Sequence, residues 1–188
     1  MTFDAAALRA RLAARTRARV AIDGFAPAAV LVPIVIEPGQ PDRLLFTERR
    51  HDLSTHAGQI AFPGGKQDAE DADHAACAVR ETTEELGIEP AAIEVLGLLD
   101  DVPTPSRFII TPVVAQLRGP IVMKPNPAEV ASVFSAEVSA LAEPARYTAN
   151  GTRTFLGITY EMHEYRWEPH RIWGATARMV YQLMSLLP

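Results

Sequence analysis

The segment GGKQDAEDADHAACAVRETTEELGIE, residues 64–89, is the part of the chain that indicates both its fold and its chemistry. It contains eight acidic residues and two basic ones, and so carries a charge of −6. The whole chain has a formal net charge of −5, which leaves +1 for everything outside the segment. The excess negative charge is therefore confined to one short window. Such a run of acidic residues has two interpretations, a helix face exposed to solvent or a site that binds a cation.

The second half of this segment, residues 74–86, is predicted to be a helix that ends at Gly87. At about 100° per residue, Glu84 and Glu85 lie within about 60° of Glu81, so three carboxylates share one face. No lysine lies four residues from Glu81 or Glu85 to relieve their repulsion. The opposite face carries small and apolar residues, namely Ala75, Ala76, Val79, Thr82, Thr83 and Leu86. This pattern favours a site for a hard divalent cation, which takes oxygen ligands.

A Pro-Gly-Gly turn, residues 63–65, comes directly before the acidic stretch. Glycine allows a backbone to approach a ligand closely, so we expect Gly65 to contact a metal ion through its backbone. Simple turn chemistry is the alternative for this residue. A metal ion held by two or three glutamates could neutralise a phosphate anhydride and activate water.

The composition limits the class of protein. With 188 residues, 48% of them apolar, the chain is long enough for one domain with a core. Its negative charge argues against non-specific binding to nucleic acid, and no apolar run reaches the ~18 residues of a membrane span. The single cysteine, Cys77, excludes an internal disulfide and fits a cytoplasmic protein. On the acidic helix, Cys77 is expected to be a small filler.

The order of the expected elements predicts an α/β sandwich formed by a single domain over residues 1–188. Helices are expected at about 4–20 and 172–187 besides the acidic one, with a short helix at 136–142, and Trp173 is expected in the core. The strands at 28–37 and 43–49 should form a hairpin, with Pro33 indicating an edge or a bulge. Further strands are expected at 59–62, 93–99, 109–117, 131–134, 153–159 and 160–167. Helices should cover both faces of a mixed sheet.

The central segment resembles the signature of a known family, the Nudix box, whose usual form is G-x5-E-x7-R-E-U-x-E-E-x-G-U. The matching residues are Gly65, Asp71, Arg80, Glu81, Thr82, Glu84, Glu85, Gly87 and Ile88. The sequence departs from this form in three ways: an aspartate at position 71, one extra residue before Arg80, and Thr82 in place of an aliphatic residue. The Arg-Glu-x-x-Glu-Glu core is intact, and no ligand role is assigned to Asp71.

Segments outside the box resemble one branch of that family, the coenzyme A pyrophosphatases. They are residues 44–49 (LLFTER) and 56–65 (HAGQIAFPGG), and the branch commonly has the longer spacing before the arginine as well. Further similarity occurs at 110–114, 129–134 and 172–177, so the resemblance spans about residues 28–187. Arg50 departs from it, because a small residue is usual there.

The resemblance implies a Nudix-type α/β/α sandwich and a hydrolase that depends on Mg²⁺ or Mn²⁺. It would split coenzyme A, or an acyl-CoA, into 3′,5′-ADP and 4′-phosphopantetheine or its acyl form. Glu81 and Glu85 would be direct metal ligands. Glu84 would bind a second metal ion or a water on the metal, and Arg80 would pair with a glutamate and hold its orientation.

Other candidate residues keep two interpretations each. Glu129 resembles a loop glutamate that serves as a base or extra ligand, or it is a capping residue on the surface. His56 contacts the substrate or makes a structural hydrogen bond, and Arg49 or Arg50 would meet a phosphate, including the 3′-phosphate.

The alternative functions are a Nudix pyrophosphatase acting on ADP-ribose, NADH or a noncanonical nucleotide, and a non-catalytic Nudix-type sensing domain. The crowded glutamates argue against the sensing domain. The expected partner is a small-molecule substrate, without nucleic acid or membrane, and a homodimer is left open.

Overall fold

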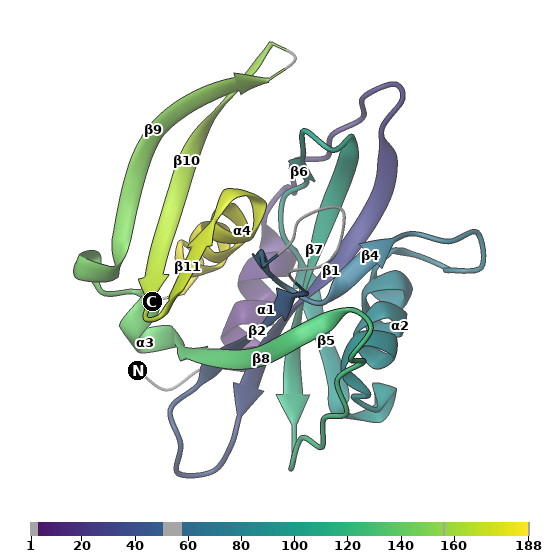
Figure 1. The fold of residues 1–188 in the computed structure, drawn as a ribbon, viewed down its shortest axis with the longest axis vertical. Coiled ribbons are helices and arrows are strands. Elements are labelled where there is room, and N and C mark those ends of the chain that lie inside the picture. Colours follow the sequence, from purple (N-terminus) through teal and green to yellow (C-terminus); the bar gives the residue numbers. More distant parts are fainter. Residues whose placement is uncertain (1–3, 51–57, 156, 188) are drawn as a thin grey trace.

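The computed structural model describes residues 4–50, 58–155 and 157–187 and arranges them as two sheets covered by helices (Figure 1). The helices are α1 (Ala5–Ala14), α2 (His74–Leu86), α3 (Val138–Leu141) and α4 (Gly174–Met184). The strands are β1 (Ala26–Ile36), β2 (Arg43–Arg49), β3 (Ile60–Ala61), β4 (Gly64–Lys66), β5 (Ile93–Leu98), β6 (Val102–Pro103), β7 (Phe108–Arg118), β8 (Val130–Glu137), β9 (Tyr147–Phe155), β10 (Ile158–Trp167) and β11 (His170–Trp173). None of the helices described is long and apolar enough to cross a membrane.

The larger sheet is mixed, as predicted. Its strand order is β3-β2-β1-β7-β5, with β8 paired to β2, β4 to β1 and β6 to β7. Strand β1 runs parallel to β7 along its whole length, whereas its pairings with β2 and β4 are antiparallel. The smaller sheet, β9-β10-β11, stands beside the larger one and projects from it (Figure 1).

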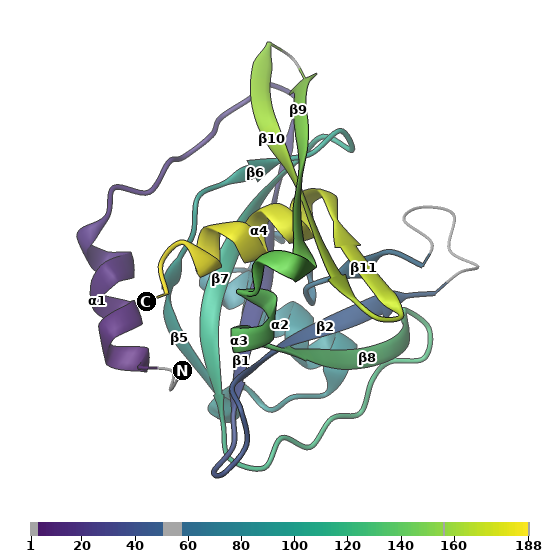
Figure 2. The same ribbon diagram turned by 90° about the vertical axis from the view of Figure 1, so that its left-hand side faces the viewer.

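The larger sheet lies between helices on both faces, which confirms the predicted α/β architecture. Successive side chains of β1 point to opposite faces. Val32 and Ile34 pack into a core with α1 and α4, whereas Leu31 and Val35 pack into a second core with α2. In Figure 2, α4 crosses in front of the sheet and α2 lies behind it.

Pro33 was expected to mark an edge or a bulge, and the edge is wrong, because β1 lies in the middle of the sheet. On one side it pairs with β4 up to Val30 and with β2 only from Ile34 onward. Pro33 falls between these two partners. The sheet therefore tolerates a residue without a backbone N–H at this position.

The predicted N-terminal helix over 4–20 was too long. Helix α1 ends at Ala14, and the chain continues in an extended form. Two aspartates after β5 bind this extended segment: Asp100 accepts a hydrogen bond from Arg15, and Asp101 accepts from Arg17 at 2.9 Å and from the backbone N–H of Val20 at 3.0 Å. These long-range bonds replace the hydrogen bonds that further helical turns would have made.

Three other boundaries differ from prediction because tertiary pairing extends strands. Residues 64–66 form strand β4 against β1 and not only the predicted turn. The single strand expected at 153–159 is divided between two strands, because β9 ends at Phe155 and β10 begins at Ile158. The closing helix begins at Gly174, because residues 170–173 form β11. Trp173 is 46% exposed, so its predicted place in the core was also wrong.

Candidate active site

Helix α2 has the bounds that its sequence predicts. Asp73 caps its start by accepting a hydrogen bond from the N–H of Ala76 at 2.8 Å. Gly87 ends it in the left-handed conformation, with φ of 64°. Cys77 is fully buried beneath β4, and burial raises the pKa of its thiol to about 11. Helix α2 packs against β1 and β4. The burial of Cys77 in this contact agrees with its predicted role as a small filler.

The three glutamates of α2 have different environments. The side chain of Glu84 is 57% exposed and that of Glu81 is 17% exposed, whereas Glu85 as a whole is only 5% exposed. The prediction of one acidic face opposite a buried apolar face was therefore wrong for Glu85. It lies on the buried side of the helix, together with Cys77 and Thr82, because the sheet covers this part of α2.

Burial disfavours the charged form of the two inner carboxylates. It raises the pKa of Glu85 to about 7, and the nearby charge of Glu129 adds to this shift, while Arg49 and a hydrogen bond from the backbone of Gly64 oppose it. Burial also raises the pKa of Glu81. A cation bound beside these two carboxylates would favour their charged forms and offset the cost of burying them.

Arg80 joins the parts of the acidic segment. Its Nη1 donates to Glu81 Oε1 at 2.9 Å and to Glu84 Oε2 at 3.1 Å. Its Nε and Nη2 donate to the two carboxylate oxygens of Asp71 at 3.0 and 2.9 Å, and this contact holds the pKa of Asp71 well below its usual range. Asp71 therefore anchors Arg80, and the predicted pairing of Arg80 with a glutamate is present.

Gly65 lies against the carboxylate of Glu81. A Cβ at this position would come within 2.5 Å of Glu81 Cδ and 2.6 Å of both of its oxygens. The close approach explains why glycine occupies this position: any side chain would displace the carboxylate from the backbone of β4.

The loop between β7 and β8 brings Glu129 toward the same place. The N–H of Asn126 donates to the carbonyl of Glu85 at 2.7 Å, and Asn126 Nδ2 lies 3.4 Å from Glu129 Oε1. Arg50 holds this loop, because its Nη1 donates to the carbonyl of Pro127 at 2.7 Å and its backbone N–H donates to that of Glu129 at 3.2 Å. Arg50 therefore contacts the 126–129 loop. It is not among the residues that line the cavity beside Glu85 and Gly65.

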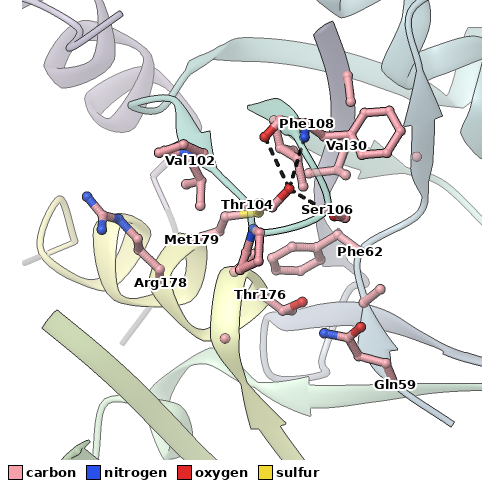
Figure 3. A pocket seen from close by; sticks show the side chains of 18 of the residues that line it. Val30, Gln59, Phe62, Val102, Thr104, Ser106, Phe108, Thr176, Arg178 and Met179 are labelled. Carbon is pink, nitrogen blue, oxygen red and sulfur yellow. Dashed lines mark hydrogen bonds between the residues drawn. The ribbon is translucent and has the colours of Figure 1, made fainter. Parts of the chain in front are cut away.

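A cavity of about 540 Å³ opens beside Glu85 and Gly65 (Figure 3). Its walls come from β1–β4, from residues 102–108, from the β9–β10 hairpin and from the start of α4. In Figure 3 the hydroxyl of Thr104 bonds to Ser106 and to the backbone of Phe108, and these bonds shape one wall. The volume is within the usual range of about 300–1,000 Å³ for a small-molecule site.

Comparison with known proteins identifies the family. The model of the NUDIX domain matches residues 26–156, which is more than half of the chain. The chain belongs to the Nudix family. A protein of Photorhabdus laumondii named uncharacterized Nudix hydrolase NudL is 38% identical, over 83% of this chain and 82% of its own. A protein of the same name from Salmonella paratyphi B is 37% identical, over 83% and 80%.

A solved structure supports the fold. The Nudix hydrolase RenU of M. smegmatis superposes with a TM-score of 0.52 over 62% of this chain and 73% of its own, at 24% identity. The prediction of a Nudix fold is confirmed, and so is the prediction of an enzyme, a pyrophosphatase of the Nudix hydrolase family. The names of the relatives specify no substrate.

Nudix hydrolases generally use divalent metal ions, and the donor set of this chain fits one. Glu81 and Glu85 are two inner carboxylates whose charged forms are disfavoured by burial, and Gly65 brings backbone against one of them. In the part of the chain that the structure describes, no three His, Cys, Asp or Glu side chains form a ready-made metal cage. Two carboxylates suit Mg²⁺, which usually keeps several water ligands.

Several cavity residues were not predicted from the sequence of this Nudix chain. They are the cations Lys66, Arg153 and Arg178, the hydroxyl residues Thr104 and Ser106, and the aromatic residues Tyr160 and Trp173. Lys66 and Trp173 lie within segments that the sequence singled out, but the other five belong to no motif and meet only in the folded chain. Of the residues predicted to bind substrate, Arg49 lines the cavity. His56 lies outside the described residues.

Gly65→Ala is expected to lower kcat/KM by about 10- to 100-fold, the usual cost of disturbing a group that orients a metal ligand. The new methyl group would push the Glu81 carboxylate aside. The melting temperature should change little, since the clash is with the flexible end of a side chain. Steady-state kinetics and thermal melting test this. Wild-type kcat/KM in a folded variant would contradict the close packing of Gly65 on the ligand.

Proposed function

We propose that this chain is a metal-dependent pyrophosphatase that hydrolyses coenzyme A or acyl-CoA, acting as one domain. One observation carries the proposal. The segments that resemble the coenzyme A pyrophosphatase branch are far apart in the sequence, yet residues from 44–49, from the described part of 56–65, and from 172–177 line the same cavity. Glu85 of the Nudix box lines it too. The branch-like residues therefore meet where a substrate would lie.

The acidic end of the site provides the hydrolytic residues. In the proposal, Glu81, Glu85 and the backbone of Gly65 hold Mg²⁺ or Mn²⁺, and Glu84, on the exposed side, would bind a second metal ion or a water on the metal. The metal ion supplies neutralisation of the pyrophosphate charge and a more acidic water. Arg80 keeps Glu81 in position through the 2.9 Å hydrogen bond. Water adds to one phosphorus atom, its P–O–P bridge bond breaks, and the products are 3′,5′-ADP and 4′-phosphopantetheine or its acyl form.

Glu129 is the proposed general base, or an extra ligand. Its charge adds to the raised pKa of Glu85, and the N–H of Asn126 in the same loop donates to the carbonyl of Glu85 at 2.7 Å. It lies on the 126–129 loop, which is bonded both to the end of α2 and to Arg50. Arg50 acts in this proposal as a positioning residue for the loop, in place of the phosphate contact expected from the sequence.

Arg49 is the proposed contact for the scissile pyrophosphate. It lines the cavity, and its charge opposes the rise in the pKa of Glu85, so it lies near the acidic end. Among the described residues its buried Nε has no hydrogen-bond partner. A buried donor without a partner is costly, and a phosphate oxygen of the substrate would satisfy it.

A substrate panel tests the proposal directly. With Mg²⁺ or Mn²⁺, the chain is expected to have its highest kcat/KM on coenzyme A or an acyl-CoA, and chromatography should identify 3′,5′-ADP among the products. ADP-ribose, NADH and nucleoside triphosphates are the comparison substrates. A higher kcat/KM for ADP-ribose would assign the chain to another Nudix pyrophosphatase. Binding without turnover of any substrate would favour the sensing domain.

Two wider predictions remain as proposals. A cytoplasmic location rests on the single cysteine, which is buried and free. A homodimer stays a prediction.

A further inference from the structure

Two arginines from different parts of the chain meet around one tyrosine in the wall of the cavity. Arg153 of β9 is the direct cross-strand partner of Tyr160 in β10. The guanidinium carbon of Arg178, on α4, lies 5.7 Å from the centre of the Tyr160 ring. All three residues line the cavity. The hairpin and α4 thus bring two positive charges to the same part of its wall.

Neither guanidinium is held by a carboxylate in an ion pair among the described residues. Within the described residues, Arg153 and Arg178 form no ion pair, although other arginines of the chain do: Arg80 with Asp71, and Arg171 with Glu164. Glu161 also lines the cavity, but it forms no ion pair with either of them. Two guanidinium groups without an ion-pair partner line the cavity together with one carboxylate, Glu161, so this part of its wall carries a net positive charge. They attract an anionic group of a ligand.

These cations are separate from the hydrolytic residues. Glu85 and Gly65 belong to α2 and β4, on the larger sheet, whereas Arg153 and Tyr160 belong to the smaller sheet. Gln59 lies next to Arg49, whose N–H donates to its carbonyl at 3.1 Å, and in Figure 3 Arg178 lies on the other side of Met179 and Thr104 from Gln59. A ligand that fills the cavity could therefore place one anionic group near Glu85 and another near Tyr160.

We propose that Arg153 and Arg178 form a second anion subsite, which binds a phosphate monoester on the ribose of the substrate. The inference rests on the proposed function, which places the scissile pyrophosphate beside Glu85. A phosphate monoester carries a charge of about −1.5 to −2 near pH 7, and two guanidinium groups match both its charge and its oxygens. The subsite supplies the contact that the sequence suggested for Arg49 or Arg50.

Ribose phosphates occur in two kinds of pyrophosphate substrate. Coenzyme A carries its phosphate on the 3′ oxygen, and NADPH carries one on the 2′ oxygen. Comparison of each with the form that lacks this phosphate isolates the contribution of the subsite. Coenzyme A is therefore compared with dephospho-coenzyme A, and NADPH with NADH.

The experiment measures kcat/KM for these four substrates on the wild type, Arg153→Gln, Arg178→Gln and Arg178→Lys. We expect wild type to prefer coenzyme A over dephospho-coenzyme A by about tenfold or more, since a charge-assisted contact contributes this much. Both glutamine variants should reduce this ratio toward one, and Arg178→Lys should recover part of it. Arg166→Gln is the matched control, because Arg166 is an exposed arginine of β10 outside the cavity lining. It should keep the wild-type ratio.

The outcomes separate this inference from the proposed function. A wild-type ratio near one, or a ratio that the glutamine variants leave unchanged while they remain folded by thermal melting, would overturn the subsite and leave coenzyme A hydrolysis intact. If coenzyme A is not hydrolysed, but the NADPH to NADH ratio is high and falls in both variants, the subsite holds and the proposed substrate is wrong.

Discussion

Glu85→Gln is expected to lower kcat/KM by about a thousandfold, because the stabilisation that a metal ion gives the transition state amounts to several kcal/mol and depends on its ligands. Glutamine has nearly the same size as glutamate and lacks the negative charge. Glu85 is only 5% exposed and is surrounded by Glu81, Glu129 and Gly64. Because the site is buried, a carboxylate from the surface cannot take the place of the lost one. Steady-state kinetics with saturating Mg²⁺ or Mn²⁺ measure the effect.

The same variant should be more stable than the wild type when both are free of metal at pH 8. The pKa of Glu85 is raised to about 7 in the folded chain from 4.5, so the fold favours the protonated carboxyl. The free energy of unfolding of the wild type therefore falls as the pH rises between these two values, and the loss is complete above them. Glu85→Gln avoids this loss, which is about 1–3 kcal/mol. Denaturant unfolding at pH 5 and pH 8 tests the sign.

Glu89→Gln is the matched control for both measurements. Glu89 is an exposed carboxylate in the same acidic segment, just beyond the end of α2. It should retain wild-type kinetics and the pH dependence of wild-type stability. A folded Glu85→Gln variant with wild-type turnover would remove Glu85 from the active site.

Removal of divalent metal is expected to abolish turnover completely, and Mg²⁺ or Mn²⁺ should restore it. The reason is electrostatic: Glu81 and Glu85 crowd negative charge at the place where a polyanionic pyrophosphate must bind, and Arg80 is already engaged by Asp71, Glu81 and Glu84. Without a cation, substrate and site repel each other. The measurement is activity after exhaustive chelation and after return of each metal.

A binding readout accompanies the activity assay. A metal ion that binds only the folded chain raises its melting temperature, and at a given metal concentration tighter binding gives a larger rise. Mg²⁺ or Mn²⁺ should therefore raise the melting temperature of the wild type more than that of Glu85→Gln. Full turnover after exhaustive chelation would show that the proposed mechanism is wrong.

The sequence alone determined features that depend on neighbouring residues. The acidic helix has its predicted bounds because Asp73 and Gly87 cap it locally, whatever the rest of the chain does. The β1–β2 hairpin and β2 itself are present as predicted, since two apolar runs separated by a turn encode them. The Arg-Glu-x-x-Glu-Glu core identified the family, because its spacing along one helix is itself a chemical pattern.

Only the tertiary structure decided which of these groups are buried and what they meet. A helical wheel places Glu84 and Glu85 on the same face, yet β1 and β4 cover one and leave the other exposed, and this difference raises the pKa of Glu85. The helix at 4–20 was cut short by hydrogen bonds to Asp100 and Asp101, which lie more than 80 positions away. Pairing partners and burial are long-range properties, so local patterns carry no information about them.

The cationic wall of the cavity shows the same limit most clearly. Arg153 and Arg178 belong to no motif in the sequence, and both come to Tyr160 only because β10 pairs with β9 and α4 brings Arg178 over the tyrosine ring. Trp173 is exposed at the cavity because β11 ends there, although its size alone predicted burial. The glutamates and the arginine proposed for hydrolysis lie on one helix, so their spacing is visible in the sequence. Substrate recognition depends on contacts between elements that are distant in the chain.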